Sequence, residues 1–129
     1  MAYIDAENIL MKTDSLSATV NGAIVDLGSK GAFMSPLYID AKLTKKLSSG
    51  SITSFTLNSS PAEAFTAITE EVKVTVPSSL PQTSRPCTLA QFHAPIKPGN
   101  RYIRITANGS SPVGGELYVT MQNGMKVDM

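Results

Sequence analysis

The segment PLYIDAKLTKKL, residues 36–47, alternates apolar and polar side chains along most of its length. The side chains that fall on one face of an extended chain are apolar: Leu37, Ile39, Ala41 and Leu43. Successive side chains of a β-strand point to opposite faces, so this alternation is typical of a strand with one buried face. The segment therefore predicts a half-buried β-strand.

The same alternation recurs in other segments, which are separated by residues that favour turns. Alternation predicts strands at 51–57, 72–76, 101–106 and 117–122, and a moderately apolar stretch predicts one more at 87–94. We expect 51–57, with Thr53, Phe55 and Leu57 on one face, to pair with 36–47 as a hairpin. The strand at 72–76 should stop at Pro77, because proline has no N–H to donate to a neighbouring strand.

Three connections between these strands carry turn signals. Lys97-Pro98-Gly99-Asn100 places proline and glycine at the two central positions of a type II turn. Asn21-Gly22 between apolar flanks predicts a tight hairpin turn, with 23–27 as its second arm. Residues 108–115, rich in glycine and serine, are expected to form a loop before the last strand.

Evidence for helix is confined to two places. Ser60-Pro61-Ala62-Glu63 combines an N-cap, a proline at the first helical position and a capping glutamate, which predicts one short turn. Residues 1–16 have no firm period, so a short helix and an extended arm are both open. The 129 residues therefore predict an all-β protein with at most one or two short helical turns. Its parts are an N-terminal arm or short helix over 1–16 and a single antiparallel β-sandwich or jelly roll over 17–129.

The composition limits the partners and the chemistry. Eleven Lys and Arg against ten Asp and Glu give a formal charge of +1, too little to gather nucleic acid or anionic lipid. The single cysteine, Cys87, excludes an internal disulfide, and the single histidine, His93, excludes a histidine pair for a metal. No apolar run is long enough to span a membrane, and we expect no cofactor, no metal and no export signal.

Catalytic interpretations find little support in the spacing of reactive residues. His93 could act as a general base for Ser84 or Cys87, but no pattern links them, and a structural or solvent-facing histidine is the better interpretation. Asp26 and Asp40 could supply the carboxylate pair of a glycosidase, but loop caps and solvated strand faces explain them better. We therefore expect a protein that is not an enzyme.

Three tyrosines fall on the polar faces of expected strands: Tyr38, Tyr102 and Tyr118. Large amphipathic rings at such positions can anchor a protein contact or stack on a sugar. They can equally well lie at the rim of the sandwich without binding anything.

Four segments, taken in order, resemble the small capsid cement, or decoration, proteins of tailed bacteriophages. They are Tyr3-Ile4-Asp5-Ala6-Glu7-Asn8, Ile24-Val25-Asp26-Leu27-Gly28, Pro36-Leu37-Tyr38-Ile39 and Pro98-Gly99-Asn100-Arg101-Tyr102-Ile103-Arg104-Ile105. The resemblance implies a β-sandwich or jelly-roll subunit that binds the outer face of the assembled head and has no catalytic residues. Its partner would be the major capsid protein. The resemblance favours a dimer near two-fold positions, although some such proteins form trimers, and the protein would be made in the host bacterial cytoplasm.

Under this hypothesis, seven residues are candidates for the contact with the capsid or another partner: Tyr3, Ile4, Ile9, Leu10, Tyr38, Tyr102 and Arg104. Residues 2–14 could reach across to a neighbouring subunit, since flexible termini can become ordered on binding. The same residues could instead pack on their own subunit. A second hypothesis is a carbohydrate- or receptor-binding module of a tail fibre or surface protein, which requires the three tyrosines to converge on one platform.

Overall fold

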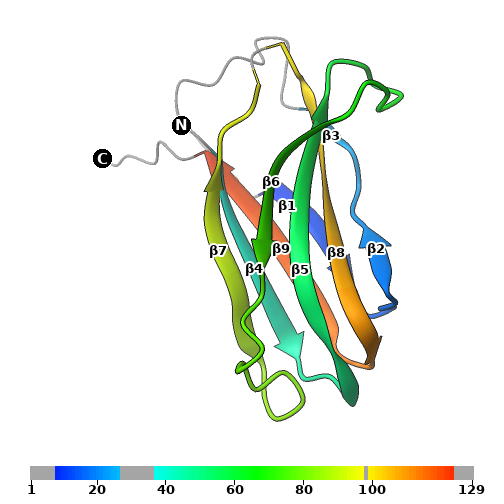
Figure 1. The fold of residues 1–129 in the computed structure, drawn as a ribbon, viewed down its shortest axis with the longest axis vertical. Helices are drawn as coiled ribbons and strands as arrows, with labels where there is room; N and C mark the ends of the chain where they lie inside the picture. The colour runs from blue at the N-terminus through cyan, green and yellow to red at the C-terminus, as the bar shows by residue number, and fades with distance from the viewer. Residues whose placement is uncertain (1–7, 27–36, 98, 124–129) are drawn as a thin grey trace.

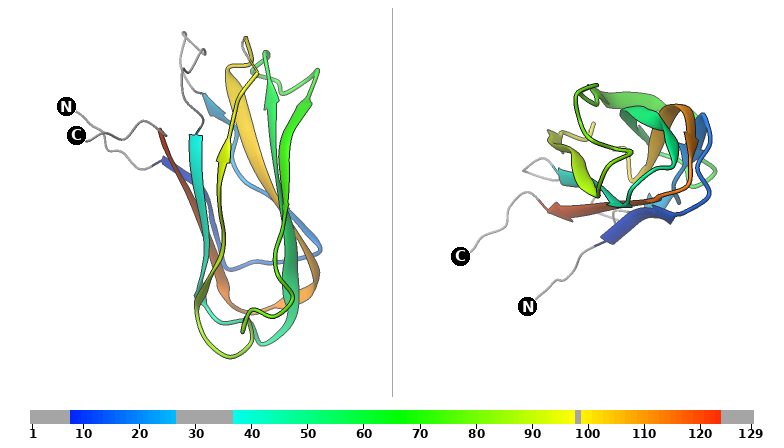
Figure 2. Two further views of the ribbon diagram at one scale, coloured as in Figure 1. Left: turned by 60° about the vertical axis from the view of Figure 1, so that its left-hand side comes forward. Right: turned by 90° about the horizontal axis from the view of Figure 1, so that it is seen from below.

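A computed structural model describes residues 8–26, 37–97 and 99–123, which form nine β-strands and no helix. The strands make two antiparallel sheets that pack face to face, as Figures 1 and 2 show. The predicted antiparallel β-sandwich is confirmed, whereas the jelly-roll connectivity stays a prediction.

The two sheets are named here sheet A and sheet B. The strands of sheet A, in spatial order, are β1 (Asn8–Thr13), β9 (Glu116–Asn123), β4 (Leu37–Lys45) and β7 (Cys87–Ala94). Those of sheet B are β2 (Thr19–Asn21), β8 (Tyr102–Val113), β5 (Ser49–Ser60) and β6 (Thr69–Thr75), and β3 (Val25–Asp26) also pairs with β8.

The core lies between the sheets and is built from the alternating apolar positions. The side chains expected to be buried on β4 are buried, and so are Ile103 and Ile105 on β8 and Phe55 on β5. Burying one such side chain stabilises the fold by about 1.5–3 kcal/mol. Burial of these alternating side chains between the two sheets therefore favours the sandwich. The expected turn before β8 also forms, because Asn100 N–H donates to the Lys97 carbonyl at 3.0 Å and Gly99 has φ of 93°.

The predicted hairpin between 36–47 and 51–57 is wrong, because the two strands lie in different sheets. β4 pairs with β7 and β9, and β5 pairs with β6 and β8. The connection crosses from one sheet to the other through Leu47, a fully buried side chain whose N–H donates to the Gln82 carbonyl. Alternation shows that each strand has one buried face, but it does not show which strands are neighbours.

Two other turn predictions also fail on β8. β2 and β3 both pair antiparallel with β8, so Asn21-Gly22 joins two parts of one edge and does not reverse the chain. The loop expected at 108–115 is mostly strand, since β8 continues to Val113 and turns only at Gly114-Gly115, both with positive φ. The polar and glycine-rich composition reflects the half-exposed end of a long strand that carries irregular pairing with β5.

The N-terminal segment differs from both an arm and a helix where the structure describes it. Residues 8–13 form strand β1, which pairs with β9 along the edge of sheet A. A register shift between Ile9 and Met11 lets two consecutive side chains, Leu10 and Met11, face the core, which hides the period of two from the sequence. The short turn expected at Ser60-Pro61-Ala62-Glu63 does form, between β5 and β6 and without a helix, with Phe65 N–H donating to the Ala62 carbonyl.

A side chain completes the pairing of β5 near its first residues. Gln82 is buried, and its amide both accepts from the Ile52 N–H at 2.7 Å and donates to the Ile52 carbonyl at 3.0 Å. Just after β6, Val76 N–H donates to the Thr53 carbonyl and continues the pairing with β5. Beyond that point, the Gln82 side chain makes the hydrogen bonds that a neighbouring strand would make. The register of β5 shifts between Ile52 and Ser54, so Thr53 is exposed and not buried as its alternation predicts.

A buried polar group fastens the turn before β8 to sheet B. The Ser59 hydroxyl, fully buried, donates to the Glu71 carboxylate at 2.6 Å and accepts from the Asn100 side-chain amide at 2.8 Å. The same carboxylate oxygen accepts from the Lys97 N–H at 2.8 Å. The buried side chains of Ser59 and Asn100 therefore have hydrogen-bond partners, which is the condition for burial of polar groups to be tolerated.

Candidate functional site

The outer surface of sheet A carries the ring-bearing side chains of three neighbouring strands. The ring centroids of Tyr38 on β4 and His93 on β7 lie 5.1 Å apart, at an interplanar angle of 52°. The two residues are direct partners in the β4–β7 pairing, which places both rings on the same side of the sheet. Tilted ring pairs at this separation are favourable beyond their buried area.

A third ring, that of Tyr118 on β9, lies between two lysines. Tyr118 is the cross-strand partner of Lys12 on β1 and of Lys42 on β4. The Lys12 ammonium lies 5.9 Å from the centre of the tyrosine ring, within the range of a cation–π contact. Lys42 in turn lies 3.6 Å from Asp40, so the positive charges on this surface are arranged around a ring and a carboxylate.

An aliphatic side chain extends this surface to the edge of the sheet. Ile9 on β1 is 49% exposed and is the cross-strand partner of Thr120, which in turn faces Asp40 on β4. We name eight outward-facing residues of sheet A the sheet A face: Ile9, Lys12, Tyr38, Asp40, Lys42, His93, Tyr118 and Thr120. Among the residues that the structure describes, the Oδ1 atom of Asp40 is buried on this face without a hydrogen-bond partner.

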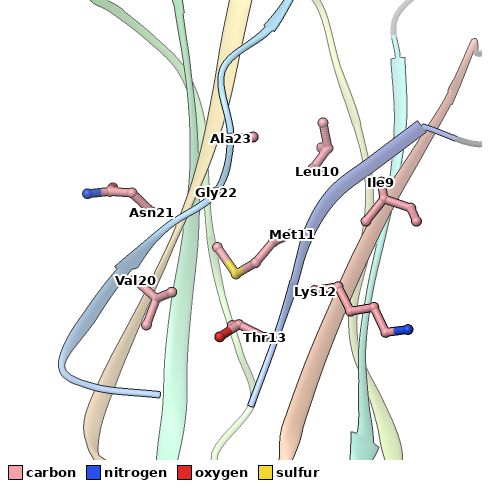
Figure 3. A pocket seen from close by; sticks show the side chains of 9 residues that line it. All are labelled: Ile9, Leu10, Met11, Lys12, Thr13, Val20, Asn21, Gly22 and Ala23. Atoms are coloured by element: carbon pink, nitrogen blue, oxygen red, sulfur yellow. The ribbon is translucent and has the colours of Figure 1, made fainter. Parts of the chain in front are cut away.

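A groove adjoins the sheet A face at the edge where β1 of one sheet meets β2 of the other. The two strands are close at one end, where Ala23 N–H donates to the Leu10 carbonyl at 3.2 Å, and diverge from there (Figure 3). A volume of about 350 Å³ opens between them, and Met11, Thr13 and Val20 point into it. The groove is thus lined by both apolar side chains and strand backbone.

The approach of the strands at the closed end depends on a glycine. A Cβ atom on Gly22 would lie 2.3 Å from the Leu10 carbonyl oxygen, which no real side chain could tolerate without movement of the backbone. Gly22 N–H also donates to the Ile105 carbonyl at 2.8 Å. Residue 22 therefore fixes the position of the groove relative to both sheets.

The predicted contact residues do not form one site. Tyr38 and Ile9 lie on the sheet A face, whereas Tyr102 and Arg104 lie on β8, on the outer side of sheet B. Leu10 is 1% exposed in the core and is therefore not available on the surface of the folded subunit. Tyr3 and Ile4 lie outside the described residues.

On sheet B, the two predicted residues contact their own subunit. The Arg104 guanidinium lies 4.8 Å from the centre of the Phe65 ring, and its Nε is buried without a hydrogen-bond partner in the described part of the chain. Tyr102 lies beneath Arg101, which forms two short hydrogen bonds to Asp26. These hydrogen bonds raise the pKa of the Arg101 guanidinium, which is charged in any case.

The candidates for catalysis can also be placed. His93 faces the Tyr38 ring, and burial raises the pKa of the Cys87 thiol, an effect that nearby Arg85 partly opposes. Within residues 8–26, 37–97 and 99–123, no three His, Cys, Asp or Glu side chains gather in a way that could hold a metal ion. The same residues contain no helix that could span a membrane.

The sequence does not predict that Lys12, Tyr118 and His93 lie on the same face as Tyr38. Tyr38 and Tyr118 are polar positions of alternating strands, whereas Lys12 and His93 lie in segments without clear alternation, and only the strand order β1-β9-β4-β7 brings the four residues to one face. Comparison with known proteins adds no relative: no protein-family model, curated protein or solved structure matches the chain.

Proposed function

We propose that the protein is a capsid cement protein that binds the outer surface of an assembled phage head through the sheet A face. The observation that carries this proposal is the sheet A face itself, where two aromatic side chains, a histidine and a half-exposed isoleucine share one side of a sheet. Tyrosine rings are enriched at the centres of protein interfaces because they combine a large apolar area with a polar atom. The resemblance of four segments of the sequence to cement proteins supplies the partner, the major capsid protein.

The mechanism is binding linkage. A subunit that binds the assembled lattice and not its separated parts stabilises the lattice by RT ln(1 + [L]/Kd) at each site. Packaged DNA pushes capsid subunits apart, and a cement subunit that contacts two of them has to be released before they separate. In this proposal the protein acts as a homo-oligomer on the outer face of the virion, with a dimer favoured over a trimer.

The alternative of a carbohydrate-binding module receives less support from the positions of the tyrosines. It requires one stacking platform, but Tyr38 and Tyr118 lie on sheet A and Tyr102 lies on sheet B. The chain also has no tryptophan, the residue that most often stacks on sugars in such modules. The arrangement of the rings therefore favours a protein partner.

Two isoleucines of equal exposure provide a matched test of the face. Ile9 on the sheet A face is 49% exposed, and Ile68, just before β6 in sheet B, is 50% exposed. We expect Ile9→Ser to weaken binding to cement-free expanded heads by about tenfold, the usual effect of losing an apolar interface side chain. Ile68→Ser should bind as the wild type does.

Binding is measured by co-sedimentation of the purified protein with heads, and thermal unfolding confirms that both variants fold. Equal loss of binding in both variants, or no loss in Ile9→Ser, would contradict the assignment of the face. Failure of the wild-type protein to sediment with any heads would contradict the proposed function.

A further inference from the structure

The Asn21-Gly22 dipeptide does not form the hairpin turn that its sequence predicts, because β2 and β3 on either side of it both pair with β8. Asparagine followed by glycine is the sequence most prone to lose the side-chain amide, because glycine has no side chain to shield the backbone nitrogen that attacks. The described residues contain a second such dipeptide, Asn108-Gly109. Both lie where β2 pairs with β8, since Thr19 faces Asn108 and Asn21 faces Thr106.

The reaction needs only water and a free backbone nitrogen. The deprotonated nitrogen of the glycine attacks Cγ of the asparagine, an N–C bond forms, and the Cγ–Nδ2 bond breaks with release of ammonia. Water then opens the cyclic imide at one of its two carbonyls. The products are aspartate, or isoaspartate with the main chain running through the former side chain. Overall, one amide and one water become a carboxylate and an ammonium ion.

The folded structure opposes ring closure at Asn21. The attacking nitrogen, that of Gly22, donates to the Ile105 carbonyl at 2.8 Å. The Asn21 side-chain oxygen accepts from the Thr106 hydroxyl at 2.7 Å, which holds the amide away from its own backbone. Ring closure also needs rotation about the Cα–C bond of Asn21, which would break the hydrogen bond between Gly22 N–H and the Ile105 carbonyl.

The second dipeptide is protected more strongly. Gly109 N–H donates to the Ala18 carbonyl at 2.9 Å, so detachment of β2 would free this nitrogen as well. Asn108, however, lies on β8, which also pairs with β5, and its side chain donates to the Ser54 hydroxyl at 3.2 Å. Its backbone therefore stays extended when β2 alone leaves.

We propose that Asn21 is a deamidation site whose reaction is gated by detachment of the three-residue edge strand β2 from β8. An aspartate at position 21 can still accept from Thr106, so this product can pair again with β8. An isoaspartate lengthens the main chain by one carbon and prevents the Gly22 bond to Ile105 from forming again. The isoaspartate product would therefore leave the edge of the groove open, and either product lowers the formal charge from +1 to 0, because eleven acids then balance eleven bases.

The test is a comparison of deamidation rates in the aged wild-type protein. The protein is held in mildly alkaline buffer with and without urea, and mass spectrometry of its tryptic peptides gives the fraction of deamidated Asn21 and Asn108. Fragment ions separate Asn108 from Asn123, which shares its peptide. In the folded protein we expect Asn21 to react at least about tenfold more slowly than in urea, and faster than Asn108, because edge strands open more readily than central ones.

A matched pair of variants tests the gate. Val20 on β2 and Val74 on β6 are both partly buried against the core and lie on edge strands of sheet B. Val20→Gly should raise the rate at Asn21 by about tenfold, since glycine weakens a strand interior. Val74→Gly should leave that rate unchanged.

The outcomes decide the proposal without reference to capsid binding. Equal rates at Asn21 in folded and unfolded protein, faster reaction at Asn108 than at Asn21, or equal effects of the two variants would overturn it. If Val20→Gly does not fold, the ratio of the Asn21 rate to the Asn108 rate still decides the proposal, because detachment of β2 alone makes this ratio higher in the folded protein than in urea and global unfolding does not.

Discussion

Replacement of Gln82 tests whether one side chain stands in for a missing strand. Its amide makes both hydrogen bonds of the Ile52 backbone, at 2.7 Å and 3.0 Å, in a buried environment. Gln82→Ala leaves a buried donor and a buried acceptor without partners, at a cost of about 1–3 kcal/mol each. Allowing for water entering the space, we expect a total loss of about 2–4 kcal/mol, or roughly 10 °C in the unfolding temperature.

Two further variants separate hydrogen bonding from packing. Gln82→Met keeps a side chain of similar length without the amide, so it should lose nearly as much stability as Gln82→Ala. The exposed neighbour Thr83 serves as the control, since Thr83→Ala should change stability by less than about 0.5 kcal/mol. Urea unfolding gives the free energies, and amide hydrogen exchange should show faster exchange at Ile52. A Gln82→Met protein as stable as the wild type would refute the reasoning.

Three further predictions concern the turns, the buried polar group and the thiol. Asn100→Ala should lower the free energy of unfolding by about 1–2 kcal/mol in urea titrations, because it removes a buried hydrogen bond, and an unchanged midpoint would contradict this. Gly50→Ala should destabilise the protein more than Gly99→Ala does. Both glycines have positive φ, but a Cβ at residue 50 would lie 2.1 Å from the Ser111 carbonyl oxygen, whereas a Cβ at residue 99 would have no atom within 4 Å. Equal melting temperatures of the two variants would exclude this steric cause. Burial raises the pKa of the Cys87 thiol, so alkylation of this thiol at neutral pH should be slower in the folded than in the unfolded chain. The alkylation rate should rise with pH, and equal rates in the folded and unfolded chains would refute the effect of burial.

The sequence predicts which faces of the strands are buried better than it predicts how the strands pair. Leu37 and Ile39 on β4 and Ile103 on β8 are buried as their alternation requires. The neighbours of β4, in contrast, are β7 and β9, whose residues are more than forty positions away along the chain. Pairing between distant strands depends on packing of the whole sandwich, and no local pattern records it.

Irregularities of the strands account for the remaining errors. The register shift in β1 places Leu10 and Met11 on the same side, and the shift in β5 turns Thr53 outward. Bulges of this kind insert a residue into the period of two, so a strand with a bulge resembles a loop or an arm in the sequence. The side chain of Gln82 has no sequence signal, because its partner is backbone from another part of the chain.

For the candidate site too, the sequence predicts which side chains point outward from their strands but not which strands are neighbours. Tyr38 could be identified from its polar position on an alternating strand, and the structure places it on the sheet A face. Its neighbours, His93 and the Tyr118–Lys12 pair, come from strands whose order the sequence does not give. Tyr102 and Arg104, which are candidates under the hypothesis of a cement protein, lie on the opposite sheet.

The most direct test of the proposed function is to image cement-free expanded heads before and after addition of the purified protein. The proposal predicts additional density on the outer surface, with β1, β9, β4 and β7 turned toward the capsid shell. Heads without added density would contradict a role as cement, and bound subunits with sheet B toward the shell would contradict the assignment of the contact face.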